Sequence, residues 1–139
     1  GIRCTSGQGS LDDFLSQSDI LVVMLPLTPQ TSGLLSAERL AHLPPGAAFI
    51  NVSRGAIVDQ AALTAALRSG QIAEATLDVF DREPLPPHDP LWQMDNVLIT
   101  PHLASVALPA SAAQQVAENI RRAARGESVT NQVFPARGY

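Results

Sequence analysis

The sequence predicts an α/β fold in which helices cover a parallel sheet. Short apolar runs, each of strand length, alternate with stretches of helical periodicity, as in chains built from βαβ units. Hydrophobic residues make up 45% of the 139 residues and charged residues only 16%, so the chain can bury a core and differs in composition from disordered proteins. Its length suits one domain.

The first strand is expected at Ile20–Leu25, a run rich in β-branched residues that Pro26 closes. A short helix should follow it. Ser36 can cap this helix at its start, and the helix can continue to Leu43 before Pro44-Pro45-Gly46 stops it.

The second strand is expected at Ala47–Val52, and the polar turn Ser53–Gly55 comes directly after it. Ligands of open α/β sheets bind at such carboxyl ends of strands. Asp59 then caps a helix that runs through Ser69, and Gly70 supplies the left-handed residue that ends it.

The third strand is expected at Ala75–Phe80, and the proline-rich loop Glu83–Pro90 leads to a fourth strand at Asn96–Thr100. A longer helix is expected from about Leu108 to Arg125, with apolar residues recurring on one side. We therefore divide the chain into a sheet-bearing part over 1–126 and a C-terminal docking tail over 127–139.

Composition excludes several classes of protein. Thirteen acidic residues stand against nine arginines, with no lysine and a net charge of -4, which argues against a nucleic-acid or anionic-membrane surface. The apolar run Ile20–Leu25 is far shorter than the roughly 20 residues that cross a bilayer. Cys4 is the single cysteine, so we expect no internal disulfide, a reducing compartment and a cytoplasmic protein.

Common nucleotide and hydrolase motifs are absent or weak. Gly7-Gln-Gly9 resembles part of a phosphate-binding fingerprint, but Asp12 stands where a glycine is needed and no strand precedes it. The sequence contains no Walker A motif, no Gly-x-Ser-x-Gly elbow and no Cys/His cluster, so we expect no metal site.

Three ionisable residues follow successive strands: Arg54, Glu83 and His102. In a parallel sheet these strand ends share one edge. A guanidinium can pair bidentately with a carboxylate, an imidazole can exchange a proton near neutral pH, and a carboxylate beside the imidazole would orient it and keep it protonated. Together they suit a 2-keto or 2-hydroxy acid.

Taken singly, each of these residues is ordinary, because loop histidines, arginines after strands and Glu-Pro pairs are common on surfaces. Their joint placement carries the hypothesis. Asp78 is also unusual, since it lies in an otherwise apolar run and needs a ligand amide, a backbone donor or a half-exposed strand end to be stable there. His42 and His88 are interpreted as surface residues.

Several segments resemble the D-isomer-specific 2-hydroxyacid dehydrogenases. The segments that carry the resemblance are Leu25-Pro-Leu-Thr-Pro-Gln-Thr31, Asn51-Val-Ser-Arg-Gly-Ala-Ile-Val-Asp59, Leu77-Asp-Val-Phe-Asp-Arg-Glu-Pro-Leu85, Pro90-Leu-Trp92 and Asn96-Val-Leu-Ile-Thr-Pro-His102. Within that family, the endings Gly126-Glu-Ser-Val-Thr-Asn-Gln-Val and Ala136-Arg-Gly-Tyr139 are most similar to the glyoxylate/hydroxypyruvate reductases.

The resemblance implies a Rossmann-type, doubly wound NAD(P)-binding domain, of which this chain is the C-terminal portion. It implies that Arg54 binds the substrate, Glu83 pairs with His102, and His102 delivers the proton while a nicotinamide delivers hydride. It further places the cofactor, NADP or NAD with NADPH favoured, against these residues: Leu25, Pro26, Thr31, Val52, Ser53, Arg54, Asp78, Ala104 and Ser105. Ser105 departs from the glycine that the family often has there.

The family's dinucleotide fingerprint and substrate domain belong upstream of the segments found here. We therefore expect the 139 residues to be part of a longer enzyme and not to turn over alone. In the usual strand order 3-2-1-4-5-6, two upstream strands would lie between Ile20–Leu25 and Ala47–Val52. Without them, two apolar strand edges would be exposed.

The function expected from these observations is reduction of a small 2-keto acid, glyoxylate or hydroxypyruvate, by a longer enzyme that the resemblance implies is a homodimer. One alternative is a non-catalytic module that senses nicotinamide and recruits a partner, for which Glu83 and His102 would be superfluous. Another is a sister dehydrogenase of the same family, such as one for phosphoglycerate.

Overall fold

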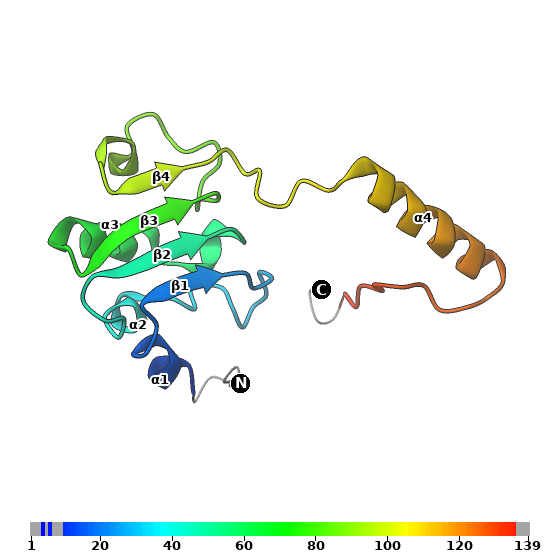
Figure 1. The fold of residues 1–139 in the computed structure, drawn as a ribbon, viewed down its shortest axis with the longest axis horizontal. Helices are drawn as coiled ribbons and strands as arrows, with labels where there is room; N and C mark the ends of the chain where they lie inside the picture. The colour runs from blue at the N-terminus through cyan, green and yellow to red at the C-terminus, as the bar shows by residue number, and fades with distance from the viewer. Residues whose placement is uncertain (1–3, 5, 7–9, 136–139) are drawn as a thin grey trace.

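The computed structural model describes residues 4, 6 and 10–135, and these form a four-stranded parallel sheet with helices (Figure 1). The strands β1 (Ile20–Val23), β2 (Ala47–Asn51), β3 (Ile72–Leu77) and β4 (Val97–Ile99) lie in the order β1-β2-β3-β4. Each neighbouring pair is parallel. The predicted α/β class and parallel sheet are therefore confirmed.

The first two strands are direct neighbours in the described chain. β1 and β2 pair directly, with Ile20 opposite Ala48 and Val23 opposite Asn51. Because their backbone groups bond to each other, the two strand edges expected to be exposed between β1 and β2 are paired in this chain. The place of the two upstream strands in a longer protein stays a prediction.

The predicted helix ends are confirmed at the caps. Ser36 accepts the amide of Arg39 at the start of α2 (Ala37–Leu40), which is shorter than the predicted helix. Asp59 accepts the amide of Ala62 at the start of α3 (Gln60–Ser69), and Gly70 ends α3 with φ 78°. These local hydrogen bonds satisfy backbone groups that a helix end would otherwise leave unpaired.

β3 begins and ends three residues earlier than predicted. Ile72 is fully buried opposite Ala47, so the strand starts before the exposed Glu74 that interrupts its apolar pattern. At the other end, the amide of Asp78 still donates to the carbonyl of Asn51, and its side chain accepts a hydrogen bond from the segment after β4.

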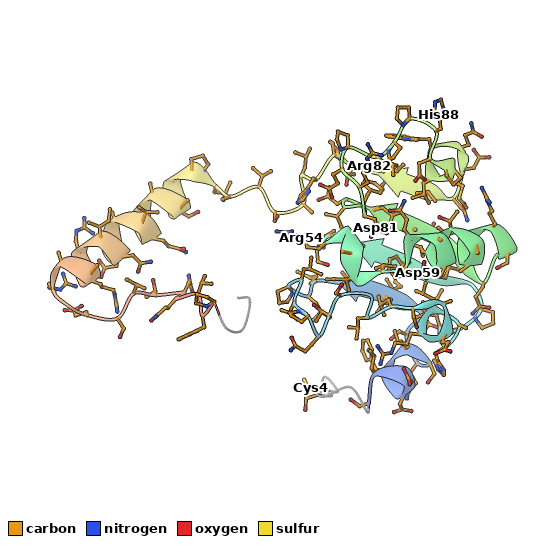
Figure 2. All side chains as sticks on the ribbon, turned by 180° about the vertical axis from the view of Figure 1, so that it is seen from behind. Cys4, Arg54, Asp59, Asp81, Arg82 and His88 are labelled. Atoms are coloured by element: carbon orange, nitrogen blue, oxygen red, sulfur yellow. The ribbon has the colours of Figure 1, made fainter. Side chains whose placement is uncertain are left out.

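Helices cover one face of the sheet in the described part of the chain. Figure 2, from behind, shows α2 and α3 in front of the strands. The buried strand residues on this side include Leu21, Val23 and Phe49, and they pack with leucines of α1 (Leu11–Leu15), α2 and α3. Ile20, Val22 and Leu98 are exposed.

The last helix, α4 (Pro109–Ala124), lies apart from the sheet at the end of an extended segment (Figure 1). It confirms the helix predicted near the C-terminus. None of its residues is buried, and its apolar Val116 and Ile120 are exposed. Within the described residues, no helix combines the length and apolar character needed to span a membrane.

A buried carboxylate joins the ends of β3 and β4. Asp78 is 2% exposed. It accepts hydrogen bonds from the Thr100 hydroxyl at 2.5 Å and from the amides of Leu103 and Ala104 at 2.9 Å each. Burial raises the pKa of Asp78, but these hydrogen bonds outweigh it, so the pKa lies below its ordinary value.

A glycine lets two loops touch at the same edge. Gly55 is buried, and a Cβ built on it would collide with the backbone of Phe80 and Asp81. Only a residue without a side chain allows the turn after β2 to approach the segment after β3 this closely.

Gly55→Ala should destabilise the fold by about 3 kcal/mol or more, at the upper end of overpacking costs, because backbone atoms cannot rotate away as a side chain can. Gly70→Ala is the control, since its Cβ would meet nothing within 4 Å and its cost comes from φ 78° alone, roughly 1–2 kcal/mol. Denaturant unfolding measures both, and equal losses would contradict the close approach.

Asp78→Asn should destabilise the protein by roughly 1–3 kcal/mol at pH 6–8, because an amide cannot accept all three hydrogen bonds. The folded-state pKa is depressed, so the carboxylate's contribution is present above the unfolded pKa of about 3.9 and is lost as pH falls below it. The difference from wild type should therefore shrink below about pH 4.

Unfolding midpoints between pH 8 and pH 3 test this dependence. Asp95→Asn, at an exposed position, is the matched control and should change stability by less than about 0.5 kcal/mol. A penalty for Asp78→Asn that stays constant down to pH 3 would show that its charge contributes nothing.

Candidate active site

Arg54 is positioned by a buried asparagine at the end of β2. Asn51 is 2% exposed. Its Oδ1 accepts the amide and the hydroxyl of Ser53 at 3.0 Å each, and its Nδ2 donates to the carbonyl of Arg54 at 3.2 Å. Sequence reasoning missed Asn51, although a polar residue that ends an apolar strand run signals such a turn.

Glu83 and His102 are in direct contact. Oε2 of Glu83 lies 2.8 Å from Nδ1 of His102, and Oε1 of Glu83 accepts the amide of Phe80 at 3.0 Å. The side chains are 37% and 41% exposed, respectively, so the pair is open to solvent. Because Nδ1 is occupied, Nε2 is the ring nitrogen that can meet a substrate.

The same contact fixes the charge on the carboxylate. The hydrogen bond with His102, followed by that from Phe80, holds the pKa of Glu83 below its ordinary value despite partial desolvation. The positive charge of Arg54 acts in the same direction. Glu83 is therefore ionised throughout the neutral range, as required of a group that orients a proton donor.

His102 has a backbone conformation that is uncommon for a residue with a side chain. Its φ is 55°, and its amide donates to the carbonyl of Thr100 at 3.1 Å. The next two amides both donate to Asp78. Strained backbone of this kind persists only where neighbours enforce it, and it is concentrated at functional sites.

Arg54 lies at the carboxyl edge of the sheet, near this pair but not bonded to it. Figure 2 shows its side chain directed outward from that edge. Its Nη1 donates to the carbonyl of Ser53 at 2.6 Å. All three residues thus lie at the predicted edge of the sheet. Glu83 and His102 are directly hydrogen-bonded, whereas Arg54 acts on Glu83 through its charge.

An apolar cavity of about 490 Å³ opens beside the Glu83–His102 pair. Besides Asp78, Glu83, His102 and Thr100, its lining consists of Phe80, Pro84, Leu85, Trp92, Ile99 and Pro101. The indole nitrogen of Trp92 donates to the carbonyl of Pro86 at 3.0 Å, which holds the ring against the loop. Sequence reasoning did not assign Phe80 or Trp92 to the site.

Six of the nine residues expected along the cofactor follow β1 or β2: Leu25, Pro26, Thr31, Val52, Ser53 and Arg54. Thr31 braces its loop by donating to the carbonyl of Pro26 at 2.7 Å and accepting the amide of Thr28 at 2.8 Å. Leu25 is exposed, whereas Val52 is half-buried and Ser53 is buried.

A second cavity, of about 730 Å³, runs along β1 and includes Leu25 and Thr31. Most of its lining is aliphatic or aromatic, so it can receive a flat group such as the base of a dinucleotide. The residues present therefore fit the adenosine side of the expected cofactor.

Other predicted residues follow β4 or lie exposed on the surface. Ala104 and Ser105 are exposed at the start of the segment toward α4, and the Ala104 amide is held by Asp78. His42 and His88 are exposed, as interpreted from the sequence. The Gly7-Gln-Gly9 segment lies outside the described residues, and among those described no three His, Cys, Asp or Glu side chains gather as a metal site.

Known proteins resemble this chain in sequence and in fold. Residues 4–104 match the family model described as D-isomer specific 2-hydroxyacid dehydrogenase, NAD binding domain. A dehydrogenase of this family from Xanthobacter autotrophicus Py2, in complex with NADPH and MES, is 68% identical with a TM-score of 0.95, over 98% of this chain and 56% of that one.

Two further structures are more distant. An NADPH-dependent glyoxylate/hydroxypyruvate reductase from Sinorhizobium meliloti, in complex with NADP and sulfate, is 37% identical with a TM-score of 0.91, over 96% of this chain and 44% of that one. A probable 2-hydroxyacid dehydrogenase from Rhizobium etli CFN 42, in complex with NADP, HEPES and L(+)-tartaric acid, is 39% identical with a TM-score of 0.86, over 95% and 43%.

The chain thus spans about half the length of the structures that it matches. The match covers the whole sheet and ends just past His102, so it includes every strand end that carries a predicted site residue. The parallel sheet is the C-terminal portion of the Rossmann-type NAD-binding domain of these enzymes, and the chain belongs to the D-isomer-specific 2-hydroxyacid dehydrogenase family.

Proposed function

We propose that the full-length protein reduces a small 2-keto acid, glyoxylate or hydroxypyruvate, to the D-2-hydroxy acid with NADPH or NADH. The observation that carries this proposal is the 2.8 Å hydrogen bond between Glu83 and His102 at the carboxyl edge of the sheet. A nicotinamide-sensing module has no need of such a coupled pair. The name of the Sinorhizobium meliloti reductase supports the choice of substrate.

Arg54, His102 and Glu83 each have a distinct role in the proposed reaction. The nicotinamide, when bound, supplies the hydride to the carbonyl carbon. Arg54 pairs with the substrate carboxylate and draws electron density toward the carbonyl oxygen. Nε2 of His102 gives its proton to that oxygen, so the carbonyl becomes a hydroxyl, and Glu83 stabilises the charged ring through Nδ1.

The cofactor is proposed to lie along the ends of β1 and β2. Its adenosine and phosphates would follow Leu25, Pro26 and Thr31, and its nicotinamide would approach Val52 and Ser53. NADPH is the favoured form because NADPH or NADP is present in the three related structures. By the same family resemblance, the full-length enzyme would be a cytoplasmic homodimer.

His102→Asn in the full-length protein should lower kcat for keto-acid reduction by roughly 10²–10⁴, the range for loss of a general acid. Asparagine suits the test because it tolerates a positive φ but cannot donate the proton. Steady-state kinetics with NADPH and glyoxylate measure kcat, and titration measures cofactor affinity, which should stay the same. His42→Asn, at an exposed site, is the control; an effect on cofactor affinity alone would disprove the role of His102.

Arg54→Lys should raise KM for the keto acid and lower kcat/KM by about 10- to 100-fold, because an ammonium cannot form the paired hydrogen bonds of a guanidinium. Arg68→Lys, on the exposed side of α3, should leave both constants unchanged. If Arg54→Lys retains wild-type kcat/KM, the residue does not bind the substrate carboxylate.

A further inference from the structure

A single side chain fastens both ends of the loop that carries Glu83. Gln60 is the first residue of α3 and is half-buried. Its Oε1 accepts the amide of Asp81 at 3.1 Å, and its Nε2 donates to Oδ2 of Asp89 at 3.0 Å. The segment between these two contacts contains Glu83, so α3 closes the loop across its base.

The two contacts lie where they can control the carboxylate. The amide of Phe80, next to Asp81, donates to Oε1 of Glu83. Asp89 uses its other oxygen, Oδ1, to accept the amide of Leu91 at 3.0 Å and thereby starts the short helix η3 (Pro90–Gln93). A shift at either end of the loop would therefore move Glu83 relative to its partner on the neighbouring loop.

The chemistry of position 60 suits a carboxamide. The group must accept from a backbone N–H and at the same time donate to a carboxylate, and an amide side chain does both. A carboxylate at this position could accept but not donate, and it would lie against the carboxylate of Asp89.

We propose that Gln60 is a positioning residue for the acid–base pair: by clamping Asp81 and Asp89, it holds Glu83 within hydrogen-bonding distance of His102. This inference rests on the proposed function, because it assumes that the pair transfers the substrate proton. Gln60 itself touches neither substrate nor cofactor. It acts through the loop, and its effect is expected on kcat rather than on cofactor binding.

Gln60→Ala and Gln60→Asn in the full-length protein test the clamp. Asparagine keeps the carboxamide but is one methylene too short to reach both partners. Both variants should lower kcat for keto-acid reduction by about 5- to 100-fold, the scale of small misplacements of catalytic groups, with NADPH affinity within about twofold of wild type. Ala65→Gln, exposed on the same helix, should leave kcat unchanged.

Exchanging the donor and the acceptor between positions 60 and 89 distinguishes loss of the clamp from a general loss of structure. Gln60→Glu alone sets two carboxylates against each other and should lower kcat. Combining it with Asp89→Asn restores one donor and one acceptor, because the asparagine amide can donate to the new carboxylate while its oxygen still caps Leu91. The double variant Q60E/D89N should recover kcat to within about threefold of wild type.

The route of the effect is tested in a Glu83→Gln background. If Gln60 acts through Glu83, adding Gln60→Ala to Glu83→Gln should lower kcat little further. Additive losses, or a double variant Q60E/D89N no better than Q60E, would overturn the clamp.

The failure of the clamp can be distinguished from the failure of the proposed function. If Gln60→Ala and Gln60→Asn keep wild-type kcat while His102→Asn lowers kcat, the clamp is wrong and the proposed function stands. If His102→Asn also keeps wild-type kcat, the proposed function fails.

Discussion

The buried carboxylate of Asp78 is the constraint on which the candidate site depends. A charge with 2% exposure is stable there only because a hydroxyl and two amides donate to it. Two of these donors directly follow His102, so the same bonds that stabilise the charge hold that residue at φ 55°. The cost of strained backbone is thereby offset within the fold itself.

Arg54 and Glu83 are positioned by contacts that do not involve Asp78. Arg54 follows a turn that Asn51 ties to the end of β2, and Gly55 lets this turn rest on the backbone beside Phe80. The same backbone segment also positions Glu83, because the amide of Phe80 donates to Oε1 of Glu83. The guanidinium and the carboxylate are thus placed relative to one shared stretch of main chain rather than independently.

The local features of the fold could be predicted because they depend on neighbouring residues. Ser36, Asp59 and Gly70 act at the helix ends as their types indicate, and the shared edge of a parallel sheet brought Glu83 to His102. The β1–β2 pairing could not be predicted, because apolar runs say nothing about which strand lies beside which. Likewise, Gln60 bonds to residues 21 and 29 positions away, beyond any local pattern.

The boundary between the sheet and α4 falls very close to the Glu83–His102 pair. Asp78 secures the chain as far as Ala104, and every residue from 105 to 108 is exposed in an extended segment (Figure 1). Such stretches are where proteases nick a folded protein. A cut there would release the terminal arm yet leave the Asp78 bonds, and with them the geometry of His102, intact.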